Sequence, residues 1–116
     1  MSQTDCLFCR IVAGDIPADI IYESDRVVAF RDINPQAPTH VLIIPRAHVS
    51  TINDMTEDHS PDFAALFLAA RLIAQSEGIA DDGYRVVMNC NAGAGQSVFH
   101  VHLHLLGGRR MTWPPG

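Results

Sequence analysis

The sequence predicts an α+β fold in which an antiparallel sheet of about five strands carries one short N-terminal helix and one long helix. Short apolar runs bounded by turn-forming residues are typical of strands that pair with their neighbours in the chain. Only one longer stretch, residues 60–78, has apolar residues at helical spacing over several turns. With 116 residues, 47% of them hydrophobic, the chain is expected to form one domain, residues 1–116, with a buried core.

The first elements are expected to be a short helix and a β-hairpin. Asp5 is a good N-cap for a helix over residues 6–13, which Gly14 would end. The two apolar runs at 20–22 and 27–30 flank a turn-like polar segment. Such a pair of runs is typical of a hairpin of antiparallel strands.

The middle of the chain is expected to supply a central strand and the long helix. A proline-containing loop, residues 32–40, precedes a continuous apolar run at 41–44 that Pro45 closes. An uninterrupted apolar run indicates a strand covered on both faces. Ser60 is expected to cap the long helix and Gly78 to end it. The apolar face of this helix consists of Phe63, Leu66, Phe67, Ala70, Ile73 and Ala74.

The last third of the chain is expected to alternate strands with short loops. Residues 84–89 follow a turn and are typical of a strand. A glycine-containing loop at 91–96 then leads to a final strand at 100–106. The tail, residues 111–116, is too rich in proline for a helix or a central strand.

Histidine alternates with apolar residues in the final strand, at His100, His102 and His104. A period of two places the three imidazoles on one face of a strand, with neighbours about 6–7 Å apart. At that spacing two adjacent rings can reach one phosphoryl group. Imidazoles grouped in this way are costly to bury unless a ligand, a metal or a reaction uses them, so the pattern indicates a functional site.

The loop before this strand favours an anion site. Its glycines let backbone amides approach a ligand closely, and Asn89 and Ser97 add neutral donors on either side. Taken alone, the loop is equally compatible with an ordinary hairpin connection. Its position next to the three histidines is what favours phosphate binding.

Two of the three cysteines, Cys6 and Cys9, lie three residues apart. This spacing is typical of a redox pair or of half of a zinc site, and it is also compatible with two buried structural thiols. His48 and His100 would complete a closed Cys₂His₂ zinc site that ties the N-terminal helix to the sheet. The odd number of cysteines argues against a disulfide framework, and Cys90 is expected to lie outside the metal site.

The charge balance excludes several classes of protein. A net charge of −5 without any basic run argues against a surface that binds nucleic acid. All eight basic residues are arginines, so neither a phosphate-binding lysine nor a Schiff base is available, and no organic cofactor is expected. The N-terminal stretch lacks the pattern of a secretory signal, and no apolar run is long enough to span a membrane. A cytoplasmic protein that does not bind membranes is therefore expected.

Four apolar residues and one carboxylate lie near these motifs. Phe8, Ile11, Phe30 and Ile33 are most simply explained as core residues. Asp32 precedes the proline-containing loop, where its carboxylate could accept hydrogen bonds from two ribose hydroxyls or could cap the loop. The residues alone leave these two roles of Asp32 open.

The alternating histidine motif at 100–106, preceded by Gly95-Gln96-Ser97-Val98-Phe99, resembles the histidine triad (HIT) superfamily of nucleotide hydrolases and transferases. The resemblance extends over nearly the whole chain, through 6–11, 16–18, 29–33, 35–40, 44–48, 107–111 and 113–116. The ending is more similar to the Hint branch, the adenosine phosphoramidases, than to the Fhit branch of dinucleoside polyphosphate hydrolases. His104 stands where the uridylyltransferase branch has glutamine, which disfavours that branch.

The resemblance implies a HIT-like fold and hydrolysis in two steps. His102 would attack the α-phosphorus of a purine nucleoside 5′-phosphoramidate, release the amine and form a nucleotidyl-imidazole that water hydrolyses. Catalysis would involve His102, His104 and Ser97. The phosphate oxygens would be held by His104, Ser97, Asn89 and the amides of Gly95, Gln96, Ser97 and Val98. The base would be enclosed by Phe8, Ile11, Phe30 and Ile33, and the ribose would be bound by Asp32.

By the same resemblance the enzyme is a homodimer in which the long helix and a strand edge meet their copies. The tail at 111–116 would contribute to the dimer, and Trp113 would reach the partner's site. Many Hint proteins lack the Cys-x-x-Cys pair, and in them the residue matching His48 lies near the nucleophile as a candidate proton relay. In this chain a structural zinc is expected instead, because four protein ligands leave no open position: Cys6, Cys9, His48 and His100.

Two other functions stay open on the sequence alone. One is Fhit-like cleavage of dinucleoside polyphosphates. The other is a nucleotide-binding sensor or scaffold whose hydrolysis is incidental. The leading prediction is a phosphoramidase with a purine nucleotide as substrate or product.

Overall fold

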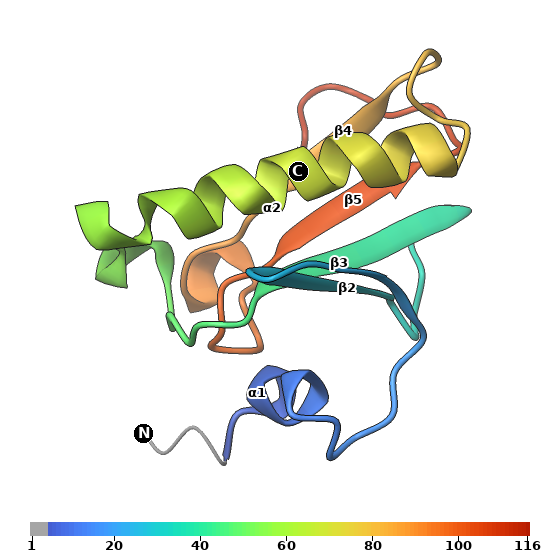
Figure 1. The fold of residues 1–116 in the computed structure, drawn as a ribbon. Helices are drawn as coiled ribbons and strands as arrows, with labels where there is room; N and C mark the ends of the chain where they lie inside the picture. The colour runs from blue at the N-terminus through green and yellow to red at the C-terminus, as the bar shows by residue number, and fades with distance from the viewer. Residues whose placement is uncertain (1–4) are drawn as a thin grey trace.

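Five antiparallel strands form one sheet in the order β1-β2-β3-β5-β4 (Figure 1). The strands are β1 (Ile20–Glu23), β2 (Val27–Arg31), β3 (Thr39–Pro45), β4 (Tyr84–Val87) and β5 (Leu103–Gly107). The computed structural model describes residues 5–116, so residues 1–4 of the predicted domain lie outside the described range. The predicted α+β class with a five-stranded antiparallel sheet is confirmed.

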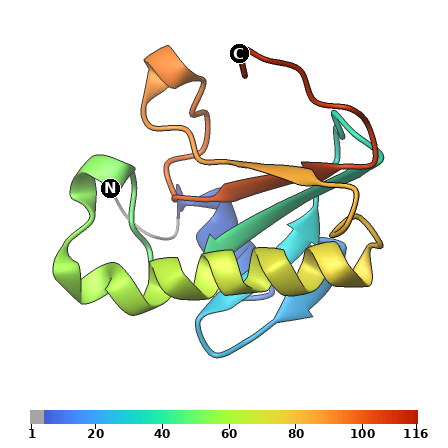
Figure 2. The same ribbon diagram turned by 90° about the horizontal axis from the view of Figure 1, so that it is seen from above.

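Two helices cover the sheet on opposite faces. The short helix α1 (Leu7–Val12) lies on one face and the long helix α2 (Ser60–Ser76) crosses the other (Figures 1 and 2). Short 3₁₀ turns occur at Ile52–Asp54, Glu57–His59 and Ala92–Ala94. Among residues 5–116, no helix combines the length and the apolar character that crossing a membrane requires.

The central strand is β3, and all seven of its residues are buried. Its successive side chains point to opposite faces, as the pleat of a strand requires, and so they enter two separate cores. Val41 and Ile43 pack beneath α2. Leu42 and Ile44 pack on the other face with α1. The apolar run therefore has the burial on both faces that the sequence predicts.

The ends of three elements differ from the predictions. Asp5 does not cap α1, because it lies one residue too early in the chain. Cys6 is the N-cap, and its sulfur accepts the N–H of Cys9 at 3.3 Å. Ser60 is the first residue of α2 rather than its cap. β4 ends at Val87 instead of continuing to residue 89, because its partner β5 does not extend that far.

The histidine strand is shorter than the predicted range of 100–106. β5 begins at Leu103, so only His104 of the three histidines lies in the ladder. Two features of the preceding segment explain this difference. The carbonyl of His100 accepts a hydrogen bond from the ring of His102, and Pro45 at the end of β3 has no N–H to donate.

The alternation of side chains nevertheless continues through the start of β5. His100 and His102 face α1, where the ring centre of Phe8 lies 6.0 Å and 5.1 Å from theirs. Leu103 belongs to the core on the α2 side. The ring centres of His102 and His104 are 5.0 Å apart. The three histidines therefore lie on the α1 side of the sheet, as their spacing predicts.

An ion pair holds the C-terminal end of α2 against the sheet. Arg31, the last residue of β2, donates to both carboxylate oxygens of Glu77 at 2.7 and 3.0 Å. The hydroxyl of Thr39 lies 3.4 Å from the same carboxylate. These hydrogen bonds hold the pKa of Glu77 below its ordinary value, and the one from Arg31 has the largest effect. The fold therefore favours the charged form of this side chain.

Replacing Glu77 with glutamine is expected to lower the free energy of unfolding at pH 7 by about 0.5–1 kcal/mol, a modest loss because the pair is partly exposed. Since folding lowers the pKa of Glu77, the contribution of its charge is complete above the ordinary carboxyl pKa of about 4.3. It is lost as the pH falls through the folded-state value. Urea unfolding of both proteins between pH 7 and pH 2 measures the difference, with Glu57→Gln at an exposed glutamate as the control. Equal stability of parent and Glu77→Gln at pH 7 would contradict this role.

Candidate active site

A cavity of about 440 Å³ opens between α1 and the sheet. Its walls come from α1, the segment 16–19, the end of β2 with the loop after it, and residues 97–98. The structure brings together nine of the residues that the sequence singles out: Phe8, Ile11, Phe30, Asp32, Ile33, Ser97, Val98, His102 and His104. The cavity thus combines an apolar slot with two imidazoles.

Two phenylalanines contribute to the apolar part of the cavity. Phe8 and Phe30 pack edge to face with their ring centres 5.5 Å apart, and both are buried. Ile11 is buried beside them, whereas Ile33 is fully exposed at the rim. Aromatic and aliphatic walls of this kind suit a flat aromatic group.

His102 has one nitrogen with a free lone pair. Its Nδ1 lies 2.8 Å from the carbonyl oxygen of His100. A carbonyl oxygen can only accept a hydrogen bond, so Nδ1 carries the proton and Nε2 of the neutral ring is unprotonated. Burial lowers the pKa of His102, which favours this neutral ring. The arrangement suits a nucleophile.

A chain of hydrogen bonds gives His104 the opposite tautomer. The backbone N–H of Gln36 donates to Nδ1 of His40 at 3.0 Å, which leaves the proton of that neutral ring on Nε2. Nε2 of His40 lies 2.9 Å from Nδ1 of His104, so His104 accepts there and carries its own proton on Nε2. The pKa of His104 is lowered to about 4. Burial is the largest cause, and the neighbouring rings of His102 and His40 lower it further. His104 is therefore a neutral ring with an N–H to donate.

His40 belongs to this site, although it is not among the site residues that the sequence predicts. It is buried at the start of β3, where it joins Gln36 to His104. Strand parity is the signal that identifies it, because His40 lies two residues before Leu42 and four before Ile44, both on the α1 side. Leu42 is also the register partner of His104 in β5.

Asp32 uses its two carboxylate oxygens differently. One accepts the N–H of Asn34 at 2.8 Å and so caps the loop after β2. The other lies 3.4 Å from Nε2 of His40, and Asp32 lines the cavity. The structure is compatible with both roles that the sequence leaves open for this residue.

Cys6, Cys9, His48 and His100 form a compact group whose ligand atoms all lie within 4.8 Å of one another. Nδ1 of His100 lies 3.4 Å from the sulfur of Cys6 and 3.5 Å from that of Cys9. Nδ1 of His48 lies 3.3 Å from Nδ1 of His100. A tetrahedron with Zn–N of about 2.0 Å and Zn–S of about 2.3 Å has N–N edges of about 3.3 Å and N–S edges of about 3.5 Å. The donor set and its spacing therefore fit a tetrahedral metal ion.

The backbone orients His100 toward this group. Its Nε2 lies 2.7 Å from the carbonyl oxygen of Pro45, so Nε2 carries the proton and Nδ1 faces the sulfurs with its lone pair. Burial lowers the pKa of His100 to about 4. The pKa of Cys9 is raised to about 11, mainly by burial and to a smaller extent by the hydrogen bond with Cys6. A metal ion that binds here consequently displaces a thiol proton.

A second set of candidate ligands, Asp32, His40 and His104, is less suited to a metal. Because Nδ1 of His40 accepts from Gln36, the proton of the neutral ring is on Nε2, the nitrogen that faces the other two ligands. A nitrogen that carries a proton has no lone pair for a metal. We interpret this set as the hydrogen-bond chain that orients His104.

The glycine-containing loop is held largely by its own hydrogen bonds. Gln96 is buried, and its side chain accepts the N–H of Asn91 at 2.8 Å and donates to two carbonyls at 2.8 and 3.1 Å. The backbone N–H groups of Gly95 and Gln96 also donate within the loop. Residues 97–98, in contrast, line the cavity. The part of the predicted phosphate loop that borders the cavity is thus its C-terminal end.

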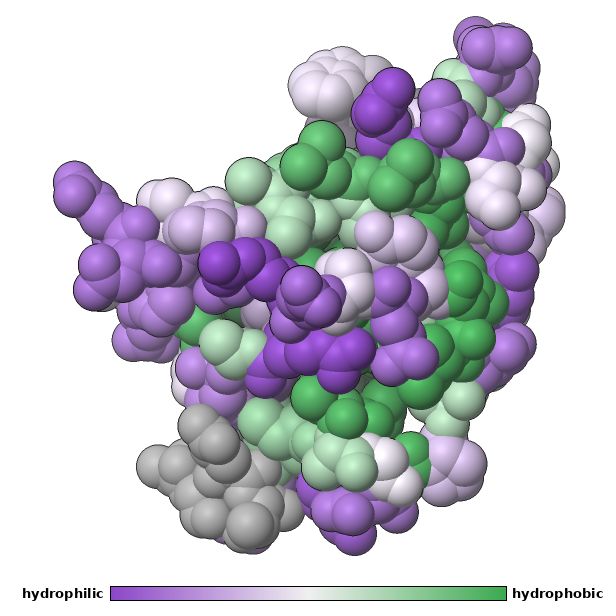
Figure 3. Space-filling model, in the orientation of Figure 1, coloured by the Kyte–Doolittle hydropathy of each residue, from purple (hydrophilic) through white to green (hydrophobic). Residues whose placement is uncertain are grey.

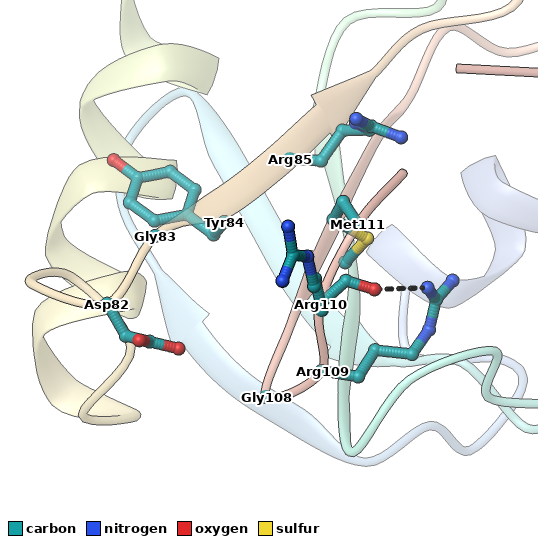
Figure 4. Close-up of a pocket in the computed structure, with 8 residues that line it drawn as sticks. All are labelled: Asp82, Gly83, Tyr84, Arg85, Gly108, Arg109, Arg110 and Met111. Atoms are coloured by element: carbon teal, nitrogen blue, oxygen red, sulfur yellow. Dashed lines mark hydrogen bonds between the residues drawn. The ribbon is translucent and has the colours of Figure 1, made fainter. Parts of the chain in front are cut away.

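Four of the predicted nucleotide-site residues do not line this cavity, namely Gly95 and Gln96 of the loop, Asn89 and Trp113. Asn89 follows β4, and Trp113 on the tail is 82% exposed. A separate cavity of about 630 Å³ lies between β4 and the segment after β5, with Arg85, Arg109 and Arg110 among its lining residues (Figure 4). None of the predicted site residues borders this arginine-rich cavity.

Comparisons with known proteins agree on one family. Residues 13–111 match the HIT domain. The chain is 50% identical over 105 residues to the purine nucleoside phosphoramidase of Escherichia coli (strain K12), which covers 90% of this chain and 88% of that protein. It is 45% identical over 118 residues to a 14 kDa zinc-binding protein of Zea mays, which covers 100% of this chain and 91% of that protein. The fold is similar to the crystal structure of a HIT family hydrolase from Legionella pneumophila, with a TM-score of 0.94 and 57% identity over 96% of this chain and 99% of that one.

Proposed function

The chain belongs to the HIT domain family, and on that basis we propose that it hydrolyses purine nucleoside 5′-phosphoramidates to a nucleoside monophosphate and an amine. The observation that carries the proposal is that one cavity contains His102, with a free lone pair on Nε2, and His104, with an N–H to donate. The similarity to a purine nucleoside phosphoramidase supports the choice of substrate.

The proposed reaction has two steps on His102. In the first, the Nε2 lone pair attacks the α-phosphorus, and the P–N bond breaks with its electron pair going to the amine nitrogen, which takes up one proton from the solvent. In the second, water attacks the same phosphorus and the bond from Nε2 to phosphorus breaks. Water thereby supplies the new oxygen of the monophosphate and replaces the proton that the amine carried away. The covalent route divides one difficult displacement into two easier ones.

Neutral hydrogen-bond donors are needed because the phosphate oxygens gain negative charge in both steps. We assign this role to Nε2–H of His104, the hydroxyl of Ser97 and the amides of residues 97–98, since these residues line the cavity. Asn89 does not line the cavity, and its contact with the phosphate stays a prediction. Gly95 and Gln96 are proposed to act by holding the loop in shape, because their amides already donate within it.

The apolar slot is the proposed binding site for the purine. The rings of Phe8 and Phe30, with Ile11 and the exposed Ile33, offer surfaces against which a flat base can pack. Asp32 lines the same cavity, and its carboxylate retains lone pairs beyond the one that caps the loop. We therefore assign the ribose hydroxyls to Asp32.

His102→Ala is expected to lower kcat/KM for an adenosine 5′-phosphoramidate by roughly 10³-fold or more, because it removes the nucleophile. Release of AMP measured by chromatography gives the rate. His59→Ala, which changes a histidine that does not line the cavity, is the matched control and should retain the parent rate.

The same assay includes a diadenosine polyphosphate, so that it separates the rival functions. Equal rates for the parent and His102→Ala would remove His102 from the nucleophile role. Preferential cleavage of the polyphosphate would indicate the Fhit-like activity instead. Tight AMP binding without turnover of either compound would indicate a nucleotide sensor.

We further propose that Cys6, Cys9, His48 and His100 hold a structural zinc ion. The tetrahedral spacing of the four donors supports this, as does the similarity to a zinc-binding protein of Zea mays. Four protein ligands leave no open coordination position, so the ion would contribute stability by joining α1 to the segments that carry the two histidines. The three cysteines are free thiols, which suits the reducing cytoplasm in which we expect the enzyme to act.

The purified protein is expected to contain one zinc ion per chain, and the double variant Cys6→Ser, Cys9→Ser to contain none. Loss of the ion should destabilise the fold, by about 4 kcal/mol where free zinc exceeds its dissociation constant 1,000-fold. Elemental analysis and thermal unfolding with and without a chelator measure both effects. Cys90→Ser is the matched control and should retain zinc. A parent protein without zinc would refute the assignment.

The long helix and the β4 edge are the surfaces of the proposed homodimer. α2 exposes Phe67, Leu68 and Leu72, and hydrophobic side chains gather over this helix (Figure 3). β4 is an edge strand on which Tyr84 is exposed. An unpaired strand edge and an apolar helix face are typical of a surface that self-associates. The tail with its exposed Trp113 is proposed to extend toward the site of the second copy.

Sedimentation analysis should give a mass twice the chain mass of 12.7 kDa. Leu68→Glu is expected to shift the protein toward the monomer, because it places a charge among the exposed apolar side chains of α2. A parent protein that sediments as a monomer at micromolar concentration would contradict the dimer.

A further inference from the structure

A second, smaller cavity adjoins the proposed nucleotide cavity. Its volume is about 230 Å³, and it shares Leu7, Ser97 and Val98 with the larger one. Its other lining residues are Asp5, Cys6 and Phe99. The three residues that line both cavities place the two side by side, with Ser97 and Val98 at their boundary.

The in-line geometry of phosphoryl displacement relates the two cavities to the reaction. The attacking and leaving atoms lie on opposite sides of the phosphorus. His102 lines the larger cavity alone, whereas Ser97 lies on the boundary between the two. A phosphorus atom held between His102 and Ser97 therefore directs its leaving nitrogen away from His102 and toward the smaller cavity.

The chemistry of the smaller cavity indicates what kind of leaving group it takes. Asp5 is exposed and is the one charged residue among those that line it in the described part of the chain. Leu7 is 44% exposed and Phe99 38% exposed, so both offer apolar surface. At about 30 Å³ for each heavy atom, the volume accommodates a group of roughly seven. A short alkyl chain with a positive charge at its far end matches this combination.

We propose that this smaller cavity is the leaving-group subsite, and that Asp5 selects aliphatic amines that carry a second, distal positive charge. The inference rests on the proposed phosphoramidase function and names the class of amine that this function releases. Leu7 and Phe99 contact the alkyl chain, and the carboxylate of Asp5 attracts the distal ammonium group. The charge is exposed, so its effect is moderate and depends on ionic strength.

Two AMP phosphoramidates test the subsite, one made from 1,4-diaminobutane and one from pentylamine. They have the same chain length and differ only in a terminal ammonium or methyl group. At low ionic strength the ratio of kcat/KM for the cationic to the neutral compound is expected to fall about fivefold on Asp5→Asn. Comparing the ratio between enzymes cancels the intrinsic reactivity of the two compounds. In 0.5 M salt the difference between the enzymes should shrink.

A control and a charge reversal complete the experiment. Asp15→Asn, at an exposed aspartate that lines neither cavity, should leave the ratio at the parent value. Asp5→Lys should instead favour the AMP conjugate of 4-aminobutanoate, which ends in a carboxylate, a gain that mere structural damage would not produce. An unchanged ratio in Asp5→Asn, while both compounds are cleaved, overturns the subsite alone. Failure of the parent to cleave either compound overturns the proposed function and the subsite with it.

Discussion

Two backbone carbonyl groups determine what two neighbouring histidines can do. Nε2–H of His100 donates to the carbonyl of Pro45, and Nδ1–H of His102 donates to the carbonyl of His100. The two rings therefore have opposite tautomers although they lie two residues apart on the same side of the sheet. His100 turns its lone pair toward Cys6 and Cys9, while the lone pair of His102 remains free. The proposed metal site and the proposed nucleophile both depend on these two hydrogen bonds.

The third histidine depends on the backbone in the same way, through one more ring. The N–H of Gln36 sets the tautomer of His40, and His40 sets that of His104. A donor at His104 beside a lone pair at His102 is the combination that attack on an anionic phosphoryl group requires. Phe8 packs against both His100 and His102, so α1 contributes to the apolar slot and to the positions of these rings.

Sequence periodicity predicted the shared side of the three histidines, because side-chain alternation survives even where the strand ladder stops at Leu103. The spacing of Cys6 and Cys9 likewise predicted a group that the fold assembles with His48 and His100. The tautomers of the histidines could not be predicted from the sequence, because they depend on the direction of backbone carbonyl groups, which only the folded chain defines. His40 was missed for a related reason, because its partner Gln36 lies in a loop that has no periodic pattern. The sequence also could not show that the amides of Gly95 and Gln96 donate hydrogen bonds within the loop, because those bonds depend on its folded shape.

The tautomer of His102 is the property that the proposed chemistry needs most, and long-range ¹H–¹⁵N NMR spectra of the imidazole rings measure it directly. At pH 7, with signals assigned by comparison with His102→Gln, we expect a protonated Nδ1 and an unprotonated Nε2 for His102. The reverse tautomer, with the proton on Nε2, or a doubly protonated ring would leave Nε2 without a lone pair for attack on phosphorus. Either result would contradict the assignment of His102 as the nucleophile.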